Sequence, residues 1–159
     1  MPINEVHKKF NDKPQKIEGK KFARVQAKDT MKRKQFANGI EQLTQEGAIQ
    51  LFYPVGAGTD SYVVGTVGTL QFEVLQYRLK SEYNVEILMT MLPFEVARWL
   101  KFDDGKKITP AALHGIDRGM FLLDRNENPV LLVENEWALG WITDNNKNLI
   151  MSATPFEGE

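Results

Sequence analysis

Serine, histidine and cysteine, the residue types typical of nucleophilic catalysis, are few or absent in this sequence, and no residues have the spacing that nucleophilic or metal chemistry requires. The serines lie outside any Gly-x-Ser-x-Gly elbow, and the two histidines, His7 and His114, are far apart along the chain. No group of His, Asp and Glu has metal-ligand spacing, and without cysteine there is no thiolate ligand or nucleophile. We therefore expect no catalytic residue, no metal site and no enzymatic activity in this chain.

Nucleotide-binding loops are missing as well. A phosphate loop needs Gly-x-x-x-x-Gly-Lys before Ser or Thr, but Leu100 stands at the first glycine position and Gly105-Lys106 is followed by Lys107. The stretch 146–149 lacks the aspartate of an Asn-Lys-x-Asp motif, which reads a guanine base. The sequence therefore predicts that the chain binds no cofactor and does not bind or hydrolyse GTP on its own.

Four basic residues form the best candidate for a binding surface. Lys28, Lys32, Arg33 and Lys34 surround the start of an expected helix, where positive charge opposes the helix dipole. Contacts with the phosphates of RNA would explain them. The alternative is purely structural: Asp29 caps the helix and partly relieves the conflict.

Arg98 is a second candidate for the same kind of contact, because it stands beside Trp99 and an arginine can both pair with phosphate and stack on a ring. Trp137 and Trp141 are spaced as neighbours on one face of a helix. We interpret these two tryptophans as core residues rather than as a ligand-binding pair.

The net charge of −1 hides an asymmetry along the chain. Residues 1–36 carry eleven Lys and Arg against four acidic residues, whereas residues 37–159 carry nine against seventeen. A basic end and an acidic remainder favour contact with a polyanion at one pole only. A solvated basic tail is the equally simple alternative.

The expected elements define an α+β fold. After the basic leader, apolar periodicity and turn signals predict strand, helix, strand, strand, helix, strand, with strands at 21–27, 48–53, 61–67 and 85–91. This order is the split βαββαβ, or ferredoxin-like, pattern, in which both helices cover one face of an antiparallel sheet. A weaker second copy follows, with strands expected at 94–102, 119–123, 130–134 and 149–153 and helical segments at 110–115 and 136–143.

These patterns predict four parts of the chain. They are a linker or the end of a preceding domain at 1–19, the ferredoxin-like unit at 20–92, a smaller α+β half packed on it at 93–155, and a loose tail at 156–159.

Both helices of the first unit carry an informative feature. Gly39 inside the first helix costs about 1 kcal/mol relative to Ala, so close packing against a neighbour is expected to compensate. The second helix, expected from Thr69 to about residue 82, has two apolar stripes where a helix buried on one face needs one. We expect one side to face the sheet and the other to face a second layer or domain. The stripes are Leu70, Val74 and Tyr77, and nearly opposite them Phe72, Leu75 and Leu79.

Nothing in the sequence favours a membrane location. No window approaches the roughly 18 apolar residues that cross a bilayer, and the start of the chain lacks the apolar core of a signal peptide. Together with the absence of cysteine, this predicts a cytoplasmic protein.

Several short sequences, in the same order along the chain, closely resemble the C-terminal part of the peptide chain release factor 3 family, the class II release factors. The resemblance is dense over residues 20–102 and looser beyond them, where it rests mainly on 148–154. The sequences that carry it are KDTMKRKQ (28–35), QEGAIQLF (45–52), VGTVGTLQFEV (64–74), LKSEYNVE (79–86) and ARW (97–99).

The resemblance implies a translational GTPase of three parts: a G domain, a β-barrel and a region similar to the third domain of elongation factor G. Such a protein binds the ribosome and, with GTP, drives class I release factors off after peptide release. This sequence contains no counterpart of the first two parts, so the resemblance implies a ribosome-contacting and interdomain-coupling region without activity of its own. Its implied partners are ribosomal RNA and protein, the G domain and the β-barrel.

Two other interpretations remain open at this point. One is a free-standing RNA-binding module that uses the basic pole, although the strand at 61–67 lacks the aromatic pattern of an RRM. The other is an ACT-like regulatory domain of ferredoxin-like topology, which would dimerise through its sheet around a small ligand.

Overall fold

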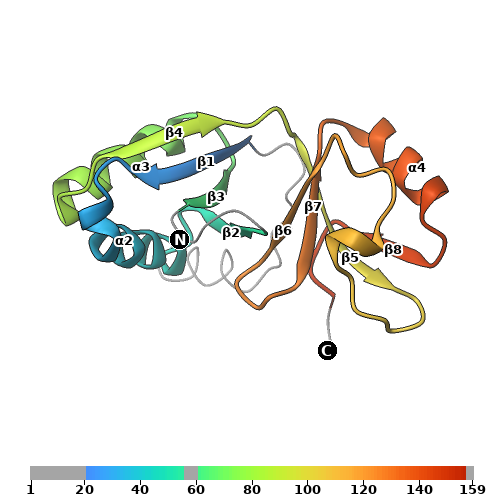
Figure 1. Ribbon diagram of the computed structural model, residues 1–159. Coiled ribbons are helices and arrows are strands. Elements are labelled where there is room, and N and C mark those ends of the chain that lie inside the picture. The colour runs from blue at the N-terminus through green and yellow to red at the C-terminus, as the bar shows by residue number, and fades with distance from the viewer. Residues whose placement is uncertain (1–20, 56–60, 157–159) are drawn as a thin grey trace, which may run out of the picture.

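The computed structural model describes residues 21–55 and 61–156, and Figure 1 shows their arrangement. The linker prediction for 1–19 and the last three residues of the predicted tail lie outside the described residues. The first half contains β1 (Lys21–Ala27), η1 (Thr30–Lys32), α2 (Arg33–Gln45), β2 (Gln50–Pro54), β3 (Ser61–Thr66), α3 (Leu70–Tyr83) and β4 (Ile87–Met91). The second contains β5 (Val96–Phe102), η2 (Pro110–Ala112), β6 (Met120–Leu123), β7 (Pro129–Val133), α4 (Glu136–Asn145) and β8 (Leu149–Ser152).

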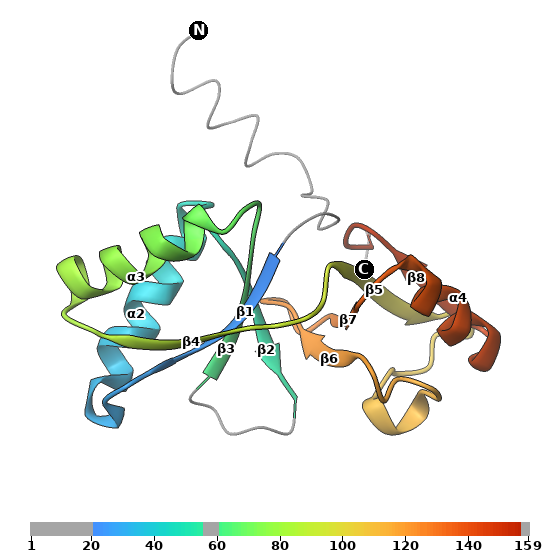
Figure 2. The ribbon, with the colours of Figure 1, turned by 90° about the horizontal axis from the view of Figure 1, so that it is seen from above.

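The first half has the predicted order of elements, and its four strands pair in the order β4-β1-β3-β2. Every pairing is antiparallel, with Val25 opposite both Tyr62 on β3 and Met89 on β4. Strand residues alternate between the two faces of a sheet. Ala23, Val25 and Val64 accordingly share one face and pack with α2 and α3 in a single core cluster, so both helices cover the same face (Figure 2).

The second half repeats the strand order of the first. In chain order, β5, β6, β7 and β8 correspond to β1, β2, β3 and β4. The second half pairs in the order β6-β7-β5-β8, and the first half, read from its inner end, pairs in the corresponding order β2-β3-β1-β4. The first helix of the repeat is reduced to the single 3₁₀ turn η2, whereas α4 occupies the place that α3 has in the first half. The predicted second copy therefore keeps its strands and loses one helix.

The two halves are joined through corresponding strands and through a shared core. β2 pairs with β6, with Tyr53 opposite Leu123, and this makes one eight-stranded antiparallel sheet within the described residues. The shared core lies between the halves and contains Phe22, Phe52 and Val63 from the first half with Phe94, Ala97, Trp99, Leu122, Val130 and Leu132 from the second. A third cluster fills the space between the second half of the sheet and α4. Figure 1 shows α2 and α3 at one end of the molecule and α4 at the other.

Close helix packing explains the glycine in α2. A Cβ atom at Gly39 would come within 2.6 Å of Leu79 Cδ2 and 3.0 Å of the Tyr83 ring, so only glycine allows α3 to approach this closely. The expected compensation for the helix-weakening glycine is confirmed. α3 then ends at Asn84, which adopts the left-handed conformation (φ 56°), and its backbone N–H donates to Lys80 O.

One expectation about aromatic residues is wrong. Trp137 and Trp141 are not core residues: their exposed fractions are 79% and 55%. Helical spacing places two residues on one face of a helix, but it does not say whether that face is covered. Phe156, the one residue of the predicted tail that the structure describes, packs against the shared core, and the Lys101 ammonium lies 4.5 Å from the centre of its ring.

Candidate functional site

The basic residues predicted to contact RNA lie where β1 leads into α2. The Lys28 N–H donates to Glu86 O at 2.9 Å and extends the pairing of β1 with β4. Asp29 Oδ1 then accepts the N–H of Met31 at 2.9 Å, so this carboxylate caps the 3₁₀ turn η1, and α2 follows directly. Asp29 therefore acts as a cap, as predicted, but it caps η1 and not the α-helix: the N-cap residue of α2 is Lys32, which makes no side-chain capping bond.

Lys32 has a structural partner that the sequence did not predict. Its ammonium donates to Asn84 O, the carbonyl just past the C-terminal end of α3, at 2.7 Å. The C-terminus of a helix carries partial negative charge and unpaired carbonyl groups, so a cation there is stabilising. One of the four positive charges at the start of α2 therefore serves to hold α3.

The other three basic residues face solvent. Lys28, Arg33 and Lys34 are exposed, and Met31 beside them is 89% exposed. A shallow groove of about 680 Å³, here called the basic groove, runs along this corner of the molecule. It is lined by Thr30, Met31, Arg33, Lys34, Phe36, Ala37 and Tyr62. The groove offers cationic groups beside apolar side chains, a combination that suits a nucleic-acid backbone with an adjacent base.

Arg98 lies in the other half of the molecule, on β5. Its side chain is only 11% exposed, and its Nη1 donates to Ala97 O at 2.9 Å. Nη2 stands 4.0 Å from Glu136 Oε1 at the start of α4. The structure therefore does not bring Arg98 to the basic groove, and it gives this guanidinium partners inside the second half.

The two apolar stripes of α3 have different environments. Phe72, Leu75 and Leu79 are buried in the core under the helix. The opposite stripe, here called the α3 stripe, consists of Leu70, Val74 and Tyr77, which are 65%, 39% and 72% exposed. Val67, which precedes α3 in the chain, is 72% exposed. The burial of the inner stripe is confirmed, and the outer stripe is available to a second layer.

An ionic cluster holds α2 and α3 together near the α3 stripe. Arg78 on α3 donates to Glu46 Oε2 at the end of α2 at 2.5 Å and to Glu82 Oε1, one turn along α3, at 3.0 Å. These hydrogen bonds favour the ionised carboxylates, so the pKa values of Glu46 and Glu82 are lowered from the ordinary glutamate value. The same bonds raise the pKa of Arg78, which keeps it charged.

The described residues contain neither a metal-ligand cluster nor a helix that could span a membrane. No group of three or more His, Cys, Asp or Glu among residues 21–55 and 61–156 is arranged to hold a metal ion. Over the same residues, every helix is too short or too polar to cross a membrane.

Comparison with known families decides the family of the chain. A family model described as "Class II release factor RF3, C-terminal domain" matches residues 15–143, which is most of the chain. The chain belongs to this family of class II release factors. The match runs from before β1 to α4, so the family resemblance extends well beyond residue 102, where the short sequences had placed its dense part.

Curated relatives agree with this assignment. The peptide chain release factor 3 of Symbiobacterium thermophilum is 46% identical over 133 residues, and that of Listeria monocytogenes is 43% identical over 132 residues. The Streptococcus mutans factor is 40% identical over 130 residues. These matches cover 84%, 83% and 82% of the chain but only 24% of each relative. The chain thus spans about a quarter of the length of these translation termination factors.

Proposed function

We propose that this chain is the C-terminal ribosome-contacting and interdomain-coupling region of a class II release factor. In this proposal the complete factor uses GTP, bound by a G domain outside this chain, to promote dissociation of class I release factors from the ribosome. The chain itself has no catalytic activity and works in the cytoplasm. Its first unit, residues 20–92, is ferredoxin-like and similar to the third domain of elongation factor G, and residues 93–155 form the second unit.

The α3 stripe is the observation that carries the coupling role. Three apolar side chains stand exposed on the outer face of a helix whose inner face is fully packed. Contiguous exposed apolar surface of this kind marks a protein interface. The relatives are about four times longer than their matched region, so the complete factor has other domains that can cover the stripe. The proposed occupant is the G domain or β-barrel of the same factor.

Association in trans tests this assignment of the α3 stripe. The chain would be mixed with the part of the Symbiobacterium thermophilum factor that lies outside the matched region, and binding would be measured by titration calorimetry. We expect saturable binding that Leu70→Ser, Val74→Ser and Tyr77→Ser together abolish, since buried apolar area supplies the affinity. The matched control is Ile150→Ser on β8, a residue as exposed as Val74.

Binding that survives the triple substitution, in variants with unchanged circular dichroism, would contradict this use of the stripe. An equal loss of binding in Ile150→Ser would also contradict it, because a general decrease in the stability of the chain would then explain the result.

The basic groove is the proposed ribosome contact, with Arg33 and Lys34 of its lining and the exposed Lys28 just before η1 as the contacting residues. Replacing all three with Ala removes three surface charges, each worth about 0.5 kcal/mol. The affinity of the chain for purified ribosomes should then fall by about tenfold and become less sensitive to salt. Co-sedimentation at several salt concentrations measures both effects. Lys106→Ala with Lys107→Ala, exposed lysines of the second half, is the control and should leave binding unchanged.

Arg98 and Lys32 are left out of that variant for a structural reason. Lys32 donates to Asn84 O at the end of α3. Arg98 donates to Ala97 O and lies 4.0 Å from Glu136 on α4, so replacement of either basic residue would combine a change in stability with a change in binding. If the triple variant binds ribosomes as tightly as the unchanged chain does, the ribosome contact lies elsewhere on the surface.

A further inference from the structure

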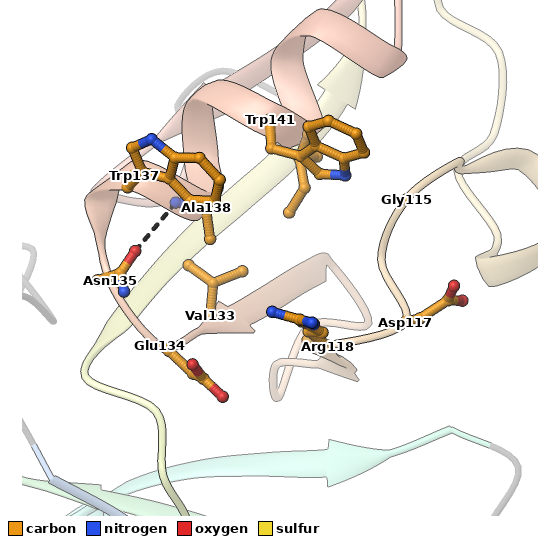
Figure 3. Close-up of a pocket in the computed structure, with 11 residues that line it drawn as sticks. Gly115, Asp117, Arg118, Val133, Glu134, Asn135, Trp137, Ala138 and Trp141 are labelled. Atoms are coloured by element: carbon orange, nitrogen blue, oxygen red, sulfur yellow. Dashed lines mark hydrogen bonds between the residues drawn. The ribbon is translucent and has the colours of Figure 1, made fainter.

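A pocket of about 570 Å³ lies at the α4 end of the molecule, remote from the α3 stripe and the basic groove. Figure 3 shows the indoles of Trp137 and Trp141 projecting from α4 on one side, Val133 beneath them, and Arg118 and Glu134 opposite. We call this the tryptophan pocket and define it by Gly115, Asp117, Arg118, Glu134, Trp137 and Trp141, which are among its lining residues.

The fold positions both tryptophans on α4 and places the Trp141 indole against a glycine. Asn135 Oδ1 accepts the Ala138 N–H at 3.0 Å and starts α4 directly before Trp137, and Trp141 follows one turn later. The edge of the Trp141 indole rests on Gly115, where a Cβ atom would come within 2.9 Å of Nε1. Gly115 also has φ +76°, a conformation that favours glycine. Two tryptophans one turn apart are thus presented at the surface, with exposed fractions of 79% and 55%.

The charged groups of the pocket are not paired with one another. Within the described chain, Asp117, Arg118 and Glu134 make no ion pair, and their side chains make no hydrogen bond. The neighbouring Glu136 is reached only by Arg98, at 4.0 Å. Carboxylates outnumber the single guanidinium of the pocket. This charge balance disfavours RNA, whose phosphates would meet two carboxylates for one arginine.

We infer that the tryptophan pocket binds a basic segment of a partner protein. A lysine or arginine side chain of that segment lies against the indole faces, and basic groups of the segment pair with Glu134 and Asp117. A cation over a tryptophan ring is the strongest cation–π arrangement, and exposed tryptophan is typical of residues that dominate protein interfaces. Arg118 then donates to backbone carbonyl groups of the same segment. This inference does not depend on the proposed function, because it concerns a separate surface.

Nuclear magnetic resonance of the indole N–H groups tests the inference in the full chain. The three tryptophans give three signals, and Trp99 is an internal reference because it is buried and its Nε1 donates to Asp124. The probe is a blocked pentapeptide, acetyl-Gly-Arg-Gly-Arg-Gly-amide. We expect it to shift the Trp137 and Trp141 signals in a saturable way and to leave Trp99 unmoved.

Variants separate the two parts of the contact. Glu134→Gln should weaken peptide binding about two- to fivefold, as expected for one exposed ionic contact. Glu127→Gln, the same chemical change on the exposed β6–β7 turn, should leave the affinity unchanged. Gly115→Ala should move the Trp141 signal of the free chain more than that of Trp137, because only Trp141 touches Gly115.

Three results would overturn the inference. They are the absence of a saturable shift with the arginine peptide, an equal shift with the same peptide carrying Glu in place of Arg, and a shift produced by hexauridylate instead of the peptide. The third result would make the pocket a nucleic-acid site.

Discussion

Asp124 organises the turn between β6 and β7 with a single carboxylate. Its Oδ1 accepts the N–H groups of Asn126 at 2.8 Å and Asn128 at 2.9 Å, and its Oδ2 accepts the Trp99 indole N–H at 2.9 Å. The turn could be predicted from its Asp, Asn and Pro residues. The bond to Trp99 could not, because the two residues are 25 positions apart and only the pairing of β5 with β7 brings them together.

Removal of this carboxylate should destabilise the chain. Asp124→Ala leaves the N–H of the buried Trp99 without an acceptor, which costs about 1–3 kcal/mol of the free energy of unfolding. Urea unfolding followed by tryptophan fluorescence measures the loss. Asp124→Asn keeps an oxygen acceptor and should lose less than Asp124→Ala. Equal losses in the two variants would show that the hydrogen bond to Trp99 is not what matters.

The Arg78 cluster predicts how stability depends on pH. Because the folded-state pKa values of Glu46 and Glu82 are lowered, their contribution is complete above the unfolded value of 4.5 and is lost as pH falls through the lower folded values. The urea midpoint of the unchanged chain should therefore decrease more between about pH 5 and pH 3 than that of Arg78→Gln. The difference is expected to be small, since these carboxylates are exposed.

Arg118→Gln is the control for this comparison, since Arg118 makes no ion pair within residues 21–55 and 61–156. It should keep the pH dependence of the unchanged chain. If the urea midpoint of Arg78→Gln decreases between pH 5 and pH 3 as much as that of the unchanged chain, the cluster does not contribute to the pH dependence of stability.

α2 and α3 show what periodicity predicts about whole elements and where it stops. The order of elements in both halves could be predicted, because helices and strands differ in the spacing of apolar residues. The inner stripe of α3 was assigned in the same way. Burial of the face of α4 that carries Trp137 and Trp141 could not be predicted, since that depends on whether another element lies over it.

Two glycines inside helices should respond oppositely to replacement by alanine. Gly39→Ala gains about 1 kcal/mol of helix propensity but overpacks the α2–α3 contact at a typical cost of 1–3 kcal/mol, so a net loss of about 1 kcal/mol is expected. Gly140→Ala on α4 has no atom within 4 Å of the new Cβ and should stabilise the chain by up to about 1 kcal/mol. Thermal unfolding of both variants measures the contrast, and a stabilising Gly39→Ala would contradict the packing account.

At the scale of the molecule, two halves with the same strand order share one sheet and one core. The pairing of β2 with β6 and the packing of Phe22 against the second half leave both helical layers on the outside, at opposite ends (Figure 1). The tryptophan pocket lies at one end, and the α3 stripe belongs to the layer at the other. A region with separate contact surfaces on one packed body is suited to pass the movement of one bound partner to another. This coupling is the role proposed for it.

The most direct test of that role is a chimera. The matched region of the Symbiobacterium thermophilum factor would be replaced by this chain, and dissociation of a class I release factor from terminated ribosomes would be measured with GTP present. The chimera should promote dissociation, whereas the same chimera with Leu70→Ser, Val74→Ser and Tyr77→Ser should bind GTP and fail to do so. A folded, GTP-binding chimera that never promotes dissociation, or a stripe variant as active as the chimera, would contradict the account.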